Sequence, residues 1–237
     1  MIIDAKISNQ NRDNIITYIK EKKAENPDFK VIDIGGSLGG WSHTVVDFIV
    51  DINPPISDTH ITFFSFDICN ESKWDKILDY VEKNGKFDFS ICSHTLEDVI
   101  HPQVICNMLP KISKEGFISV PSKFRELCRW EGRGIPGNSV NYRGYIHHRW
   151  IMHIINDTLY AWSKISIIEN NFFDAIADMN ENKMDLNFRW QNDFNFELVN
   201  SGFLGPSGFH IIKYYYDGLK DNIIDEVFGR VYLKFVN

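Results

Sequence analysis

Between residues 29 and 122 the chain repeats one pattern, in which a short, compact apolar run alternates with a polar or helical segment. Strands that are apolar along their length and alternate with helices are typical of a parallel sheet covered on both faces. The runs that predict strands are 29–34, 47–52, 60–68, 86–93 and 116–121. The pattern therefore predicts an α/β fold with a Rossmann-like, doubly wound, mostly parallel sheet and helices on both faces.

Helices are predicted over 7–26, 71–84 and 101–109. In the second of these, apolar residues recur every three or four positions, which places them on one buried face. Gly85 follows it directly, where a left-handed cap is usual. Pro27 and Pro110 are expected to end the other two helices, because the residue before a proline avoids helical geometry.

The C-terminal half fits this pattern less clearly. Residues 123–145 are polar, aromatic and rich in glycine, which predicts a long loop over a site. Residues 148–168 predict a β-hairpin that turns at Asn156-Asp157, and 194–199 and 209–216 are further strand candidates. The simplest organisation is a single domain over 1–237, with 123–200 as an inserted or embellished region on the substrate side and a β-hairpin after the fifth strand.

Composition narrows the classes of function. The 237 residues carry a net charge of −7 and no dense block of Lys and Arg, which makes a nucleic-acid partner unlikely. The four cysteines form no C-x-x-C pair, which predicts neither a zinc nor a redox motif and indicates a reducing, cytoplasmic setting. The N-terminus does not have the pattern of a signal peptide, and no apolar run has the length of a membrane span, so we expect no membrane partner.

The stretch VIDIGGSLGGW, 31–41, ends the first predicted strand in a glycine-rich turn. Ligands of parallel α/β sheets bind at the carboxyl ends of strands, and glycines let the backbone approach a ligand closely. The dinucleotide pattern G-x-G-x-x-G fails because Ser37 stands at its second glycine. The phosphate-loop pattern fails because no lysine follows Gly40. The sequence therefore supports a nucleotide-binding oxidoreductase less well than the other candidate functions.

Other features stand at the ends of the following strands. Asp51 ends the second strand and Asp67 the third, FDFSICSHTLEDVIHP covers 87–102, and GFISVP forms the fifth strand. Together with the turn, they resemble the motifs of class I S-adenosylmethionine-dependent methyltransferases of the type 11-like group. The resemblance implies that Asp51 binds the ribose hydroxyls and that Asp67 lies near the adenine of S-adenosylmethionine. The cofactor-binding residues it implies are Asp33, Gly35, Gly36, Ser37, Gly39, Asp51, Asp67, Ile68, Ser93 and His94.

Each acid also has an ordinary structural explanation. Asp33 is suited to capping the turn, as well as to ordering the loop or facing a ligand. Asp51 is suited to a solvated position before a proline turn, and Asp67 to the N-cap region of the helix at 71. Two features depart from the family pattern. Ser37 replaces a glycine, and the short interval from Gly35 to Asp51 leaves room for only about two turns of helix or for an irregular segment. A non-catalytic S-adenosylmethionine-binding or interaction module on the same fold is therefore the alternative.

Methyl transfer from an activated sulfonium requires mainly that the acceptor be positioned, and a base is needed only if the acceptor loses a proton. His94, His147 and His148 are the candidates for that base, although a histidine can also simply fix a loop. Tyr142, Arg143, Tyr145 and Arg149, in NYRGYIHHRW, suit a small-molecule or glycan acceptor; packed aromatics at a hairpin edge are the alternative. No metal site is expected, because consecutive histidines point in opposite directions on a strand and no third ligand is placed by spacing.

Overall fold

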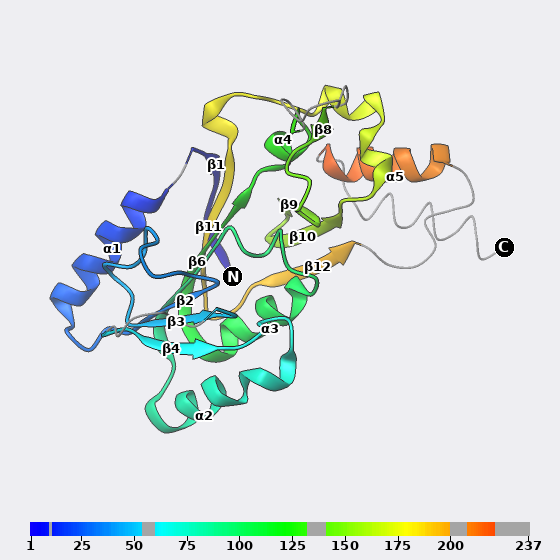
Figure 1. Cartoon of the computed structure of the whole chain (residues 1–237). Coiled ribbons are helices and arrows are strands. Elements are labelled where there is room, and N and C mark those ends of the chain that lie inside the picture. Colours follow the sequence, from blue (N-terminus) through cyan, green and yellow to red (C-terminus); the bar gives the residue numbers. More distant parts are fainter. Residues whose placement is uncertain (10, 54–59, 132–140, 200–207, 221–237) are drawn as a thin grey trace.

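The computed structural model describes residues 1–9, 11–53, 60–131, 141–199 and 208–220 (Figure 1). Its main sheet has seven strands in the order β1-β11-β6-β5-β2-β3-β4. The strands are β1 Ile2–Ser8, β2 Val31–Ile34, β3 Phe48–Asp51, β4 Thr62–Ser65, β5 Phe87–Ser93, β6 Ser113–Pro121 and β11 Asp185–Gln191. From β4 to β6 all neighbours are parallel. The chain adds strands on one side of β2 and then on the other, so the sheet is doubly wound and Rossmann-like, and its order reverses between β2 and β5.

Two antiparallel strands extend the sheet beyond β6, and the sequence analysis predicted neither. β11 pairs with β6 from Asp185 opposite Pro121 to Gln191 opposite Glu115, and β1 covers the outer side of β11. The helix expected over 7–26 is α1, Arg12–Glu25, because the residues before it belong to β1. The first segment of the chain therefore completes the edge of the sheet that the later segment β11 would otherwise leave unpaired.

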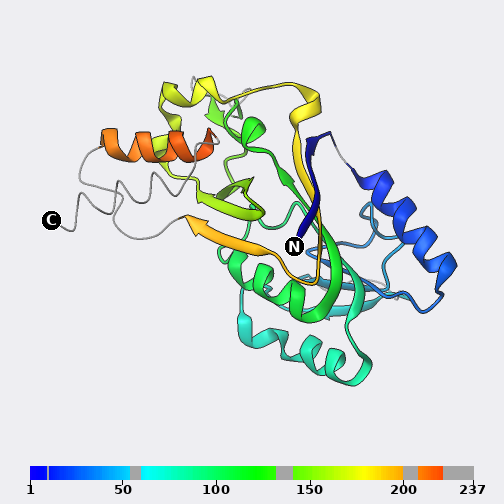
Figure 2. The same ribbon diagram turned by 180° about the vertical axis from the view of Figure 1, so that it is seen from behind.

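Helices cover both faces of the parallel strands. α1 and α2, Asp75–Asn84, lie on opposite sides of β2, β3 and β4 in both views (Figures 1 and 2). α1 buries Ile15 and Ile19 against one face, while α3, Pro102–Ile112, packs Ile105 and Leu109 against the other. Neighbouring residues of β2 point to opposite faces, and both faces are buried, which explains why this strand is apolar apart from Asp33.

Two predicted helices have different boundaries in the structure, and one predicted strand is a helix. A 3-10 turn, η1 Glu71–Trp74, precedes α2. α3 continues through Pro110 to Ile112, because Ile112 is fully buried in the same core as the helix. The strand candidate 209–216 is instead helix α5, Gly208–Leu219. Its buried residues Tyr214, Tyr215, Gly218 and Leu219 have helical spacing, which the run of apolar and aromatic side chains obscured.

A second, three-stranded sheet lies beside the main one, in the order β12-β10-β9. β9, Trp150–Ile155, and β10, Thr158–Ser163, are antiparallel, and β12, Asn195–Val199, is parallel to β10. The turn between β9 and β10 falls at Asn156-Asp157, as the sequence predicts, with φ of +46° and +60°. Both residues have the left-handed backbone that a type I′ turn requires.

The region expected to be a long loop over 123–145 contains regular structure among its described residues. Ser122 caps the short helix α4, Lys123–Glu126, by accepting a hydrogen bond from the Arg125 backbone N–H. β7, Arg129–Glu131, then pairs with β8, Tyr142–Arg143; residues 132–140 lie outside the described part. The 3-10 turns η2 Ser166–Glu169, η3 Asn171–Ala175 and η4 Glu181–Lys183 complete this side. Among the helices described, none is long and apolar enough to cross a membrane.

Candidate functional site

The glycine turn after β2 lies at the carboxyl edge of the sheet, against the end of β5. Gly35 has φ of +78°, and its N–H donates to the Val50 carbonyl at 2.7 Å. A Cβ at Gly35 would collide with the Thr95 side chain, so only glycine fits where the two strand ends meet. Residues 35–47 form turns and contain no helix. Of the two possibilities that the sequence allows here, a short helix or an irregular segment, the structure has the irregular segment.

Asp33 lies beneath this turn and orders it. Its buried carboxylate accepts a hydrogen bond from the Ser42 hydroxyl, and a Cβ at Gly36 would collide with it. Burial raises the pKa of Asp33 to about 6, against the opposing effect of the Ser42 hydrogen bond. Of the roles that the sequence left open for Asp33, these contacts favour the ordering of the loop.

The acids at the next two strand ends shape their own turns. Asp51 is half-buried, and its Oδ1 accepts from the Asn53 N–H at 2.8 Å. Asp67 is exposed, and its Oδ1 accepts from the Cys69 N–H at 2.9 Å. The N-cap of the following 3-10 turn is Asn70, and Asp67 orders the turn that leads into it. Both carboxylates lie at the edge that carries the glycine turn.

The remaining residues implied to bind a cofactor lie along the same edge. Ser37 and Gly39 are exposed at the tip of the glycine turn, and Ile68 is buried after β4. Gly39 has φ of +81° with open space around it. The structure thus brings together the strand-end positions that the resemblance selected.

His94 follows β5 in an unusual backbone conformation. Its φ is +52°, a left-handed value that costs a residue with a Cβ about 1–2 kcal/mol. Its Nδ1 lies 3.3 Å from Glu97 Oε1 and its Nε2 lies 3.7 Å from Asp185 Oδ1. Burial opposes the charged imidazolium, but the hydrogen bond and charge of Glu97, together with Asp185, raise the pKa of His94 above its ordinary value.

Several polar atoms around His94 are buried without a hydrogen-bond partner among the described residues. They are Ser93 Oγ, His94 Nε2 and Glu97 Oε2. Buried polar groups are normally hydrogen-bonded, so three such atoms together indicate a place where a polar ligand or water binds. The sequence analysis includes Glu97 only within the motif FDFSICSHTLEDVIHP and does not include Asp185. The alternation of Leu186, Phe188 and Trp190 was the signal that could have located that strand.

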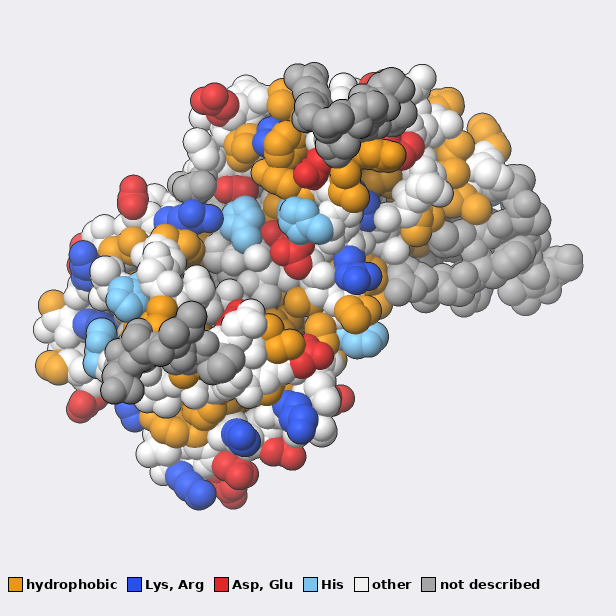
Figure 3. Space-filling view, viewed as in Figure 1, with side chains coloured by type: hydrophobic (Ala, Val, Ile, Leu, Met, Phe, Trp, Pro, Cys, Tyr) orange, Lys and Arg blue, Asp and Glu red, His pale blue; other side chains and the backbone are white. Residues whose placement is uncertain are grey.

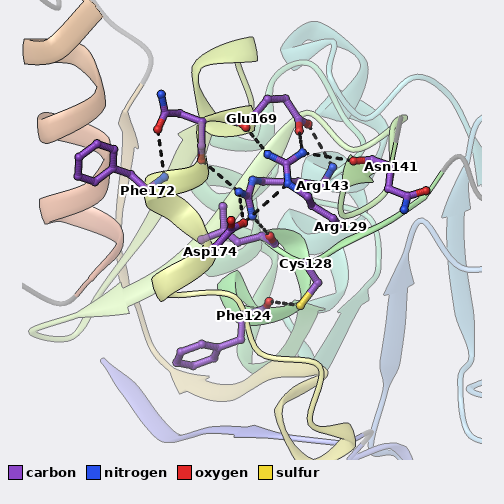
Figure 4. A network of polar contacts seen from close by, with 10 residues as sticks. Phe124, Cys128, Arg129, Asn141, Arg143, Glu169, Phe172 and Asp174 are labelled. Carbon is purple, nitrogen blue, oxygen red and sulfur yellow. Dashed lines mark hydrogen bonds and ion pairs between the residues drawn. The ribbon is translucent and has the colours of Figure 1, made fainter. Parts of the chain in front are cut away.

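Arg143 does not face the site. Figure 4 shows its guanidinium inside a network with Asp174, Arg129 and Glu169. Arg143 is 1% exposed and donates to the carbonyls of Leu127 and Asn170 (the latter at 3.1 Å), and to Asp174 Oδ1 at 2.5 Å. Its donors hold β8 to the 3-10 turns η2 and η3, so we do not retain Arg143 among the candidates for acceptor binding.

The other residues of NYRGYIHHRW lie nearer the carboxyl edge of the main sheet. Tyr142 and Arg149 are exposed. The Arg149 N–H donates to the Glu97 carbonyl at 2.7 Å, which fixes this segment beside the end of β5. Tyr145 packs edge-on against Trp130 with ring centroids 4.5 Å apart, and at the same separation against His148. Histidine and acidic side chains gather in the middle of this face (Figure 3).

The sequence predicts that His147 and His148 lie on a strand, but in the structure neither of them does. His147 is part of a turn and His148 directly follows it, so the alternation of a strand does not apply and both rings approach Asp98. His147 Nε2 lies 3.8 Å and His148 Nε2 lies 3.6 Å from Asp98 Oδ1. The fold supplies a third potential ligand, Asp98 from the loop after β5, which spacing in the sequence did not place beside the two histidines.

No protein-family model matches the sequence, and no curated protein matches it. Among solved structures, the methyltransferase domain of bacterial CtHen1-C has 12% identity and a TM-score of 0.41, over 77% of this chain and 98% of that one. A cyclopropane-fatty-acyl-phospholipid synthase-like protein from Lactobacillus casei has 11% identity and a TM-score of 0.34, over 79% of this chain and 96% of that one. The methyltransferase MycE, in complex with Mg, SAH and mycinamycin VI, has 11% identity and a TM-score of 0.33, over 87% of this chain and 60% of that one. Values this low assign no family, so function must be inferred from the site.

Proposed function

We propose that this protein is a class I S-adenosylmethionine-dependent methyltransferase that acts on a small-molecule or glycan acceptor. The observation that carries the proposal is the gathering of the glycine turn, Asp51, Asp67 and His94 along one carboxyl edge of a doubly wound sheet. We further propose that 1–237 is one domain, in which 123–200, with the hairpin β9–β10, forms an inserted region on the substrate side.

The electrostatics of this edge favour a cationic ligand over a pyrophosphate. Dinucleotide sites place the pyrophosphate at a helix N-terminus, whose dipole attracts the negative charge. Here no helix begins within 35–47, and the strand ends carry Asp51, Asp67 and Glu97 instead. Carboxylates repel a pyrophosphate and attract the sulfonium and ammonium groups of S-adenosylmethionine. This contrast supports the methyl donor over a nicotinamide dinucleotide.

The proposed residue roles follow from position. The backbone of Gly35, Gly36, Ser37 and Gly39 would let the cofactor approach the turn that Asp33 holds in shape. Asp51 would accept from the ribose hydroxyls, and Asp67 and Ile68 would flank the adenine. S-adenosylmethionine, when bound, supplies the activated methyl group. The side chains of Ser93 and His94 would lie beside the acceptor, with Tyr142, Tyr145 and Arg149 facing it from the substrate side.

His94 is the proposed base for a hydroxyl acceptor. Its raised pKa means that the neutral, proton-accepting form becomes dominant only above the ordinary histidine range. Turnover should therefore rise with pH through a value above 6.5. His94→Gln should lower kcat and remove this rise while leaving cofactor binding measurable.

Calorimetry of the full chain with S-adenosylhomocysteine and S-adenosylmethionine tests the proposal, with NAD as the control ligand. We expect binding of the first two and no binding of NAD. If a folded sample binds neither adenosyl ligand at about millimolar concentration, the proposal is wrong. Release of S-adenosylhomocysteine in the presence of a cell-extract acceptor pool then tests turnover.

The alternative function is a non-catalytic S-adenosylmethionine-binding or interaction module. The absence of any helix between Gly35 and Asp47, together with Ser37, is the observation that favours it. It predicts cofactor binding without turnover on any acceptor pool. Methyl transfer that depends on His94 would eliminate it.

A further inference from the structure

Three potential metal-binding side chains converge beside the site, from segments far apart in the sequence. Asp98 lies in the loop after β5, and His147 and His148 lie in and next to the turn before β9. One oxygen or nitrogen ligand atom from each lies within 4.8 Å of the other two. The Arg149 N–H bond to Glu97 and a 2.7 Å bond from Trp150 Nε1 to the Val99 carbonyl hold the two segments together on both sides of the cluster.

The orientation of His148 is fixed from behind. Its Nδ1 lies 2.7 Å from Glu126 Oε1, and Glu126 is completely buried. The other Glu126 oxygen accepts from Lys164 Nζ at 2.8 Å, and Oε1 is placed to accept from His148 in the tautomer that carries its proton on Nδ1. This arrangement leaves the lone pair of Nε2 directed toward Asp98. A buried carboxylate that orients the far nitrogen of a histidine is the usual outer-shell partner of a metal ligand.

A second, independent observation comes from Glu97. Its side chain is 1% exposed, its Oε2 has no hydrogen-bond partner among the described residues, and it directly precedes Asp98 in the chain. A buried carboxylate oxygen without a donor calls for a cation or a bound water nearby. The residue before Asp98 thus carries an unsatisfied acceptor, and three potential ligands converge at the cluster itself.

We propose that Asp98, His147 and His148 bind a divalent first-row transition-metal ion such as Zn²⁺ or Mn²⁺. Two imidazoles and one carboxylate suit such ions, whereas Mg²⁺ and Ca²⁺ prefer oxygen ligands throughout. Ligands at zinc-like bond lengths stand about 3.4 Å apart in a tetrahedron. The separations of 3.6 and 3.8 Å from Asp98 therefore need to close by only a few tenths of an ångström. The side chains of Asp98 and His147, which are 43% and 64% exposed, have room to make that change.

Three protein ligands leave at least one coordination position for water or for an oxygen atom of a bound molecule. Metal binding at this cluster requires neither the proposed cofactor nor an acceptor. It can therefore be measured on the protein alone, and its failure would leave the proposed methyl transfer untouched.

The test is calorimetric titration of the chelator-treated full chain with Zn²⁺ and Mn²⁺, and absorption spectroscopy with Co²⁺. We expect one ion per chain and a visible Co²⁺ band. His147→Ala and Asp98→Asn, both at exposed side chains, should weaken binding at least about 100-fold, and Glu126→Gln about 10- to 100-fold. The matched control is His101→Ala, another exposed histidine outside the cluster.

The proposal is overturned if the folded wild-type chain binds no ion at about millimolar concentration. It is also overturned if His147→Ala and Asp98→Asn bind as tightly as His101→Ala, since binding would then be adventitious. Circular dichroism and an unchanged Tm of the ion-free His147→Ala and Asp98→Asn variants ensure that a loss of affinity reports on the ligands and not on folding.

Discussion

At the scale of single residues, the glycine turn contains two positive-φ glycines in different surroundings. Gly35 is enclosed by Thr95, whereas Gly39 has open space around it. Both alanine variants should lose about 1–2 kcal/mol to the left-handed backbone. Gly35→Ala should lose a further 1–3 kcal/mol, roughly, to the collision with Thr95. Urea unfolding measures the difference, and equal losses would show that the Thr95 contact is not tight.

Asp33 makes the stability of the protein depend on pH in a direction opposite to that of most acids. Its pKa is raised from 3.8 to about 6 by burial, so the folded state holds the proton more tightly than the unfolded state. Its contribution is fully favourable below pH 3.8 and is lost as the pH rises through about 6. Relative to Asp33→Asn, the wild type should lose at most about 3 kcal/mol across that range.

Denaturant unfolding of wild type and Asp33→Asn at about pH 4 and about pH 7 isolates this effect, because other titrating groups cancel in the difference. A stability difference that does not change with pH would show that the Asp33 carboxyl titrates normally. The Ser42 hydroxyl that donates to it offers a second check. Ser42→Ala should raise the pKa of Asp33 further, because the hydrogen bond favours the ionised form.

At the scale of elements, Arg143 and Arg149 lie in one sequence cluster but have different surroundings. Arg143→Met removes a buried guanidinium that holds β8 to Asn170 and to Asp174 in η3, so it should destabilise the fold by about 2–4 kcal/mol. Arg149→Met, at an exposed side chain, should change stability by no more than about 0.5 kcal/mol. Thermal and urea unfolding measure both. Comparable stabilities would mean that the network in Figure 4 contributes little.

The elements also show what sequence reasoning can and cannot reach. The five parallel strands were predicted because a strand buried on both faces must be apolar throughout, and that signal is local. β1 was missed because it is an edge strand with mixed polarity, whose pairing depends on the distant β11. α5 was predicted as a strand because a continuous run such as FHIIKYYY fits both periods until its packing partners are known.

The candidate site also has a part that the sequence predicts and a part that it does not. The strand-end residues were predicted to lie along one edge because topology alone brings the carboxyl ends of parallel strands together. The pairs His94–Asp185 and His148–Glu126 join residues 91 and 22 positions apart, and no spacing in the sequence indicates them. Asp98 enters the sequence analysis only within the motif FDFSICSHTLEDVIHP. Long-range convergence from the second half of the chain is therefore the part that the sequence could not predict.

At the scale of the whole molecule, a ligand that bridges the strand ends should stabilise the entire fold, because it binds the folded state alone. S-adenosylhomocysteine at about 100 times its Kd should add about 2.7 kcal/mol, or roughly 5–10 °C in Tm for a chain of this size. Asp51→Ala removes the proposed charge-assisted hydrogen bonds to the ribose, which should weaken binding by about 1.5–3 kcal/mol. At the same ligand concentration less than half of the stabilisation should then remain, since it varies with the logarithm of ligand over Kd. The matched control is Asp79→Ala, at an exposed acid on α2, which should keep the full shift. A full shift in Asp51→Ala as well would place the ribose elsewhere, and differential scanning fluorimetry over a ligand series distinguishes these outcomes.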